Sequence, residues 1–71
     1  MTLKEFLEDY KGFDFGNGEI VIVNQRTAKS YICKLDKDGN LYNAMHHDFT
    51  VESEMRVYSF THSDRTMLIT L

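Results

Sequence analysis

The chain has 71 residues, a formal net charge of −3 at pH 7 and a single cysteine. Its length allows one domain, so we expect residues 1–71 to fold as one unit of modest stability. The acidic balance weighs against a non-specific nucleic-acid binder, which needs clustered Lys and Arg. A lone cysteine excludes a disulfide within the chain and fits a reducing, cytoplasmic setting. The apolar runs are much shorter than the roughly 20 residues that cross a bilayer, so no membrane segment is expected.

The first segment has the features of a short amphipathic helix over residues 2–11. Thr2 and Glu5 form a T-x-x-E capping box, in which the threonine oxygen accepts from a backbone N–H and the glutamate reaches back. Apolar side chains then recur at helical spacing on one face, namely at Leu3, Phe6, Leu7 and Tyr10. Gly12 follows where a left-handed C-terminal cap belongs. A helix this short is marginal alone, so its apolar face is expected to pack on the rest of the domain.

Turn signals divide the middle of the chain into strands. Residues 17–18 are Asn-Gly, and the β-branched run 19–23 that follows predicts a central strand covered on both faces. Residues 30–35 alternate in polarity, as a half-buried strand does. The turn at 36–40 contains Asp-Gly, which supplies the positive φ of a tight hairpin, so 41–45 is predicted to be the second strand of that hairpin. In the strand predicted at residues 30–35, one face carries Tyr31, Cys33 and Leu35.

The last third of the chain predicts a second hairpin. Residues 50–54 fit either one helical turn or a loop, whereas residues 55–61 and 66–71 read as strands joined by a polar connection. A helix followed by strands indicates an α+β fold. We therefore expect an N-terminal amphipathic helix packed on a small four- to five-stranded antiparallel sheet of hairpins, with the opposite sheet face partly open.

The residue patterns indicate no catalytic, cofactor or metal site. His46 and His47 are adjacent and would point to opposite faces of a strand, and with His62 they do not form the spaced ligand set typical of zinc. We expect these histidines to be exposed in loops. Cys33 lies in mid-strand and is expected to be a buried, inert thiol. The chain contains neither a G-x-S-x-G elbow nor a G-x-x-x-x-G-K-[ST] phosphate loop, so we expect no enzyme.

Two other classes of function remain open from the residues alone. Aromatic side chains on the predicted strands could stack single-stranded bases beside nearby basic residues; they are Tyr31, Tyr42, Tyr58 and Phe60. The chain could instead be a structural homodimer in which an edge strand such as residues 66–71 pairs across a two-fold axis.

A resemblance points to a third class. The run T-L-K-E-F-L near the start, the turn Asp-x-Asp-Gly-Asn and the ending M-L-I-T-L together resemble a set of short uncharacterised proteins of bacterial phages and conjugative elements. Mobile elements encode many small, acidic, non-enzymatic inhibitors of host defence, anti-CRISPR proteins among them. The resemblance implies such an inhibitor, which would act by occluding a surface of a host protein such as a CRISPR nuclease.

The leading expectation is therefore a non-catalytic protein-binding module. Small size, acidic balance and the lack of catalytic patterns favour it, and an exposed sheet face or the last strand would offer the docking surface. An acidic group with one tyrosine could meet a basic nucleic-acid channel on the target. The predicted partner contacts are Asp48, Glu52, Glu54 and Tyr58.

Overall fold

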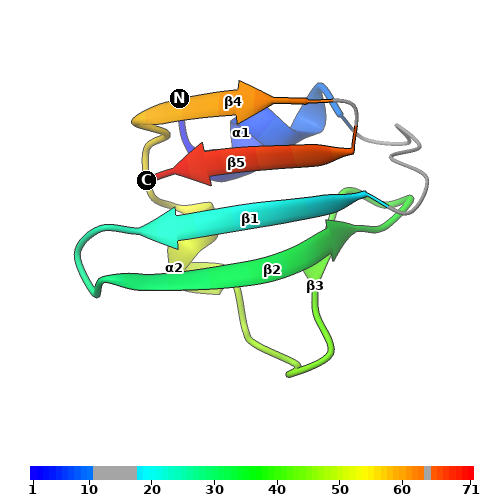
Figure 1. The fold of residues 1–71 in the computed structure, drawn as a ribbon, viewed down its shortest axis with the longest axis horizontal. Helices are drawn as coiled ribbons and strands as arrows, with labels where there is room; N and C mark the ends of the chain where they lie inside the picture. Colours follow the sequence, from blue (N-terminus) through cyan, green and yellow to red (C-terminus); the bar gives the residue numbers. More distant parts are fainter. Residues whose placement is uncertain (11–17, 64) are drawn as a thin grey trace.

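A computed structural model describes residues 1–10, 18–63 and 65–71, and in it two short helices lie over one face of a five-stranded sheet (Figure 1). The expected α+β class is confirmed. The elements in chain order are α1 (Leu3–Glu8), β1 (Glu19–Asn24), β2 (Lys29–Leu35), β3 (Leu41–Tyr42), α2 (Thr50–Ser53), β4 (Ser59–His62) and β5 (Thr66–Thr70).

The sheet has the strand order β3-β2-β1-β5-β4, so β1 is central as expected. It pairs antiparallel with β2 and parallel with β5. The expectation of a sheet built only from antiparallel hairpins is therefore wrong at the β1–β5 contact. The chain passes through β2, β3, α2 and β4 before β5 enters beside β1, and β4 pairs with the other side of β5. Because β5 has neighbours on both sides, it cannot be the edge strand foreseen for a homodimer.

The helix α1 begins with the expected capping box. The Thr2 backbone N–H donates to Glu5 Oε1 over 2.9 Å, and the Glu5 N–H donates to Thr2 Oγ1 over 3.2 Å. The Glu5 carboxylate also accepts from the Thr2 hydroxyl, and the hydrogen bonds that it accepts from Thr2, first from the backbone N–H and then from the hydroxyl, lower the pKa of the Glu5 carboxyl. The helix ends at Glu8 with Asp9 as its C-cap, earlier than the expected residue 11. The cap expected at Gly12 and the turn expected at Asn17 lie outside the described residues.

The hairpin between β2 and β3 is confirmed. Asp36 accepts hydrogen bonds from the backbone N–H groups of Asp38 and Asn40, each over 2.9 Å, and Gly39 has the positive φ of 87° that the turn needs. The second strand is shorter than expected, ending at Tyr42. A turn follows at once, in which the His46 N–H donates to the Asn43 carbonyl oxygen and His46 has a φ of 56°.

Of the two structures expected for residues 50–54, the helical turn forms as α2. The hairpin of β4 and β5 is also confirmed, although β4 begins at Ser59 rather than Met55. The residues before β4 pair with the N-terminus instead, because the Leu3 N–H donates to the Met55 carbonyl and the Val57 N–H to that of Met1. These bonds join the start of α1 to the segment that leads into β4.

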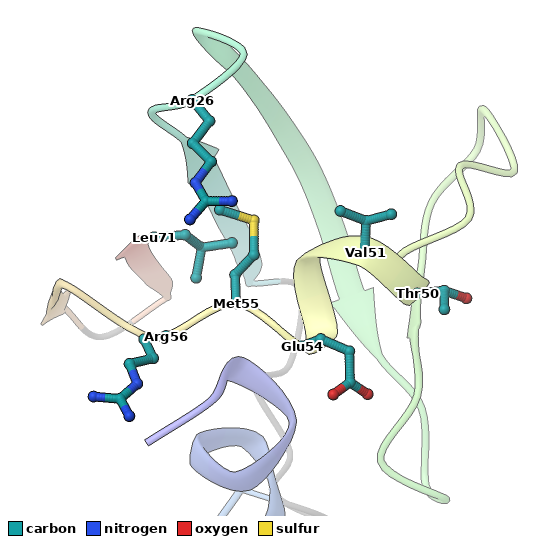
Figure 2. Close-up of a pocket in the computed structure, with 7 residues that line it drawn as sticks. All are labelled: Arg26, Thr50, Val51, Glu54, Met55, Arg56 and Leu71. Atoms are coloured by element: carbon teal, nitrogen blue, oxygen red, sulfur yellow. The ribbon is translucent and has the colours of Figure 1, made fainter.

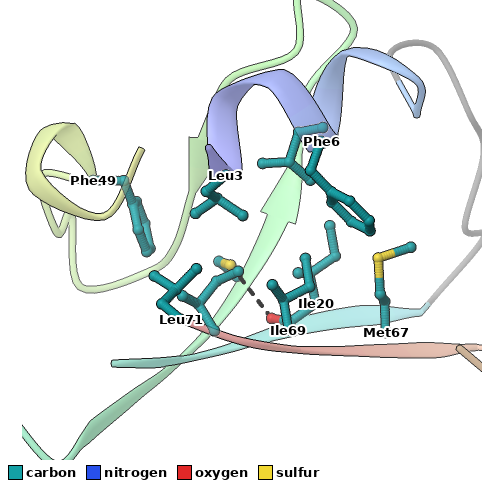
Figure 3. Packing of buried hydrophobic residues seen from close by; sticks show 10 residues of the cluster. Leu3, Phe6, Ile20, Phe49, Met67, Ile69 and Leu71 are labelled. Carbon is teal, nitrogen blue, oxygen red and sulfur yellow. Dashed lines mark hydrogen bonds between the residues drawn. The ribbon is translucent and has the colours of Figure 1, made fainter. Parts of the chain in front are cut away.

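The core lies between the helices and the sheet, as Figure 3 shows for the side chains that project from α1 toward β1 and β5. The buried apolar residues are Leu3, Phe6, Leu7, Ile20, Ile22, Cys33, Phe49, Met67, Ile69 and Leu71. The expected apolar face of the first helix is confirmed, with Tyr10 packed at its margin. The expected coverage of β1 on both faces is not confirmed. Ile20 and Ile22 are buried, but Val21 and Val23, on the other face, are only half-buried.

Candidate binding surface on the open face of the sheet

The sheet face away from the helices is called the open face here. Because side chains alternate along a strand and paired residues share a face, the register assigns its members. They are Glu19, Val21, Val23, Ser30, Ile32, Lys34, Tyr42, Ser59, Thr61, Thr66, Leu68 and Thr70. The helices lie over the other face, so no described helix or strand forms a second layer above these side chains (Figure 1).

An apolar row crosses the open face at its middle. Val21 lies opposite Ile32 on one side and opposite Leu68 on the other. Ile32 is 61% exposed and Leu68 39% exposed, which is high for aliphatic side chains on interior strands. Such contiguous exposed apolar surface is typical of interaction sites.

A pocket of about 460 Å³ opens at the β2–β3 end of this row. Ile32, Tyr42 and Ala44 supply its apolar wall, and Glu19 and Lys34 lie at its polar side. Tyr42 is half exposed and sits opposite Lys34 in the register. The volume lies within the range of about 300–1,000 Å³ that ligand pockets occupy.

Glu19 and Lys34 are also the only charged strand residues of the open face, so the face is close to neutral in an acidic protein.

The predicted acidic contact surface does not form as expected. Asp48, Glu54 and Tyr58 are exposed, but Glu52 is only 4% exposed and cannot be part of a docking surface in this conformation. Hydrogen bonds from the Thr50 side chain and backbone N–H hold Asp48 at the start of α2 and lower the pKa of its carboxyl. None of these residues belongs to the open face. A contact role for Asp48, Glu54 and Tyr58 stays a prediction.

Glu52 is instead joined to His47, which corrects the expectation that this histidine is an exposed loop residue. His47 Nε2 and Glu52 Oε1 are 2.6 Å apart. The imidazole stacks on Tyr31 with ring centroids 4.0 Å apart, and it meets Phe49 edge-on at 4.6 Å. A pattern of apolar residues in the sequence would not reveal this cluster. Glutamate and histidine are expected on the surface when only the sequence is considered, and here a ring from another strand covers them. Among the described residues, no group of three or more His, Cys, Asp and Glu could hold a metal ion.

Cys33 is buried, as expected, and its Sγ donates to the Ile20 carbonyl oxygen over 3.3 Å (Figure 3). Burial raises the pKa of the thiol from 9.0 to about 12. We expect iodoacetamide at pH 8 to alkylate the folded protein roughly a hundredfold or more slowly than the guanidinium-unfolded chain, because the thiolate is the reactive form. Equal rates, followed by mass spectrometry, would contradict this.

The same thiol has a consequence for stability. The unfolded chain releases the proton above pH 9.0, whereas the folded protein retains it until about pH 12. The contribution of the buried, protonated thiol to the free energy of unfolding is therefore constant below pH 9.0. It is lost as the pH rises from 9.0 to about 12.

The aromatic residues considered for base stacking do not share one face. Tyr31 and Phe60 lie on the helix-covered face, where Phe60 contacts Phe6 with ring centroids 4.8 Å apart. Tyr42 lies on the open face, and Tyr58 precedes β4. No stacking platform results from these four rings.

Comparison with known proteins finds no matching family model, no curated relative and no matching solved structure. In the part of the chain that the structure describes, neither helix has the length and apolar character needed to cross a membrane.

Proposed function

We propose that the protein is a non-catalytic binding module that docks on a partner protein through the open face of its sheet. The observation that carries this proposal is the apolar row of Val21, Ile32 and Leu68, which leads into the pocket beside Tyr42. Interface energy concentrates where an apolar or aromatic anchor fills such a pocket and the surrounding contacts exclude water.

The composition of the open face favours a particular kind of partner surface. Serine and threonine flank the apolar row, and the charges of Glu19 and Lys34 cancel. A partner surface with a protruding apolar side chain and a neutral, polar rim would pay little desolvation free energy when it docks on this face. A strongly basic channel would gain nothing from this face, so the open face and the predicted acidic contacts call for different partner surfaces.

The narrower function is the one that the resemblance implies: inhibition of a host defence factor, such as a CRISPR nuclease, by occluding its surface. It is compatible with a small domain whose open face offers a docking surface. Single-stranded nucleic-acid binding has less support, because the four aromatic residues are divided between faces.

Affinity purification with three baits tests the open face. Wild type, Ile32→Glu and the control Met45→Glu are used on a lysate of the cell that carries the gene, and recovered proteins are quantified by mass spectrometry. Met45 is even more exposed than Ile32, but it lies in the turn after β3, outside the strands of the open face, and does not line the pocket. We expect at least one protein whose recovery falls about tenfold with Ile32→Glu alone, since a buried charge without a partner weakens an interface.

The result also separates a foreign partner from a second copy of the chain. Equal recovery of every protein with all three baits would refute docking through the open face. Light scattering of the purified protein over a dilution series would show a dimer, lost in Ile32→Glu, if the occupant is a second copy.

A further inference from the structure

A second pocket, of about 720 Å³, lies between the β1–β2 turn and the segment from α2 to residue 56 (Figure 2). Met55 and Leu71 form its apolar base, and the exposed side chain of Val51 extends that base along α2. Figure 2 shows Arg26 and Met55 pointing toward one another beside Leu71, whereas the side chain of Arg56, which also lines the pocket, extends away from them on the side of α1. This pocket is separate from the open face and has a different chemistry.

Both arginines are carried by ordered backbone. The Arg26 N–H donates to Oδ1 of Asn24 over 3.0 Å, and Asn24 is itself buried at the end of β1. Arg56 forms an isolated β-bridge with Thr2 at the start of α1. The fold therefore sets the positions of the two Cα atoms. Ligand binding need not order the backbone there, so it costs less conformational entropy.

The two guanidinium groups have no carboxylate partner among the described residues, where the only ion pair joins His47 and Glu52. Glu54 lines the same pocket but pairs with neither arginine. The charge of Arg56 makes only a minor contribution to the lowered pKa of Glu5, which is due first to hydrogen bonds from Thr2. An acidic protein thus presents a pocket with two cations and one anion.

We infer that this pocket binds an acidic peptide segment of a partner protein. An apolar side chain of the peptide packs on Val51, Met55 and Leu71, and its carboxylates pair with Arg26 and Arg56. Arginine suits this role because its planar fork donates two parallel hydrogen bonds to one carboxylate. Glu54, on the α2 side of the pocket, accepts from a peptide N–H and repels a uniform polyanion. The inference does not rest on the proposed function of the open face.

Amide-resolved NMR titration of the whole protein tests the inference with two synthetic peptides. The probe is acetyl-Glu-Leu-Asp-Glu-amide, and its uncharged counterpart is acetyl-Gln-Leu-Asn-Gln-amide. We expect saturable shifts for the amides of residues 26, 51, 55 and 56 with the acidic peptide, and binding at least about tenfold weaker with the uncharged one.

The variant Arg26→Gln/Arg56→Gln should weaken binding of the acidic peptide by at least about tenfold, whereas Arg65→Gln should leave it unchanged. Arg65 has the same charge but does not line the pocket. Equal affinity for both peptides, or an equal loss in Arg65→Gln, would overturn the inference. Inorganic phosphate producing the same shifts at the same concentration would also overturn it, because the site would then be a general anion site. The open-face variant Ile32→Glu should bind the peptide like wild type, so failure of one proposal is distinguishable from failure of the other.

Discussion

Replacing His47 with alanine should lower the free energy of unfolding by about 3 kcal/mol, which is a large part of the stability of a domain this size. The substitution leaves the Glu52 carboxylate buried without its partner 2.6 Å away, and it removes the ring that stacks on Tyr31. An uncompensated buried charge is costly because the protein interior cannot replace the water that solvated it. Urea denaturation at pH 7 measures the loss.

Two further variants separate the electrostatic cause from lost packing. Glu52→Gln in the His47→Ala background should recover part of the loss, because a neutral amide is less costly to bury than a carboxylate. His46→Asn is the matched control: His46 is exposed and has a positive φ that asparagine tolerates, so it should change stability by less than about 0.5 kcal/mol. If His46→Asn is as costly as His47→Ala, or if Glu52→Gln recovers nothing, a buried charge is not the cause.

The second large effect is expected in the centre of the sheet. Ile22→Ala should destabilise the protein by about 2–5 kcal/mol, because Ile22 is fully buried and lies between Tyr31 and Ile69 on the neighbouring strands. The cavity would lie where β1 meets both its antiparallel and its parallel partner, so little relaxation can fill it.

Ile32→Ala is the matched control for this effect. It removes the same atoms from the same sheet, but from a side chain that is 61% exposed on the open face. We expect it to cost less than about 1 kcal/mol, since much of that surface is already in water. Denaturant unfolding of the two variants measures the difference in their stability, because a shift of the midpoint at an unchanged m-value reports a change in the free energy of unfolding. Similar losses would mean that the open face is covered in solution, and light scattering would then show whether a second copy covers it.

Local patterns predicted those parts of the fold that depend on neighbours in sequence. The capping box of Thr2 and Glu5 and the Asp36–Gly39 turn are contacts within four residues, so the residues that make them are visible together in the chain. The same holds for the strand character of β1, which follows from its β-branched residues. Even the helical turn of α2 was one of the two structures expected, since a short polar segment permits few others.

The candidate sites depended on contacts that the chain does not place together. His47 and Glu52 are near in sequence, but the rings that pack against His47 come from Tyr31 of β2 and from Phe49. An acidic side chain in an irregular segment was therefore expected on the surface, and for Glu52 that was wrong. The two arginines of the second pocket are 30 positions apart, and nothing in their local sequence indicates that they line the same space.

By itself, the sequence determined that an amphipathic helix precedes strands and that two hairpins form, because capping, turn chemistry and polarity alternation act over a few residues. Only the tertiary structure decided that β5 lies parallel beside β1, which leaves β3 and β4 as the edges. Both β1 and β5 are apolar enough to accept several neighbours, so strand order is selected by the packing of the whole core rather than by either strand. That choice also sets Val21, Ile32 and Leu68 in one row on the open face, where the proposed partner docks.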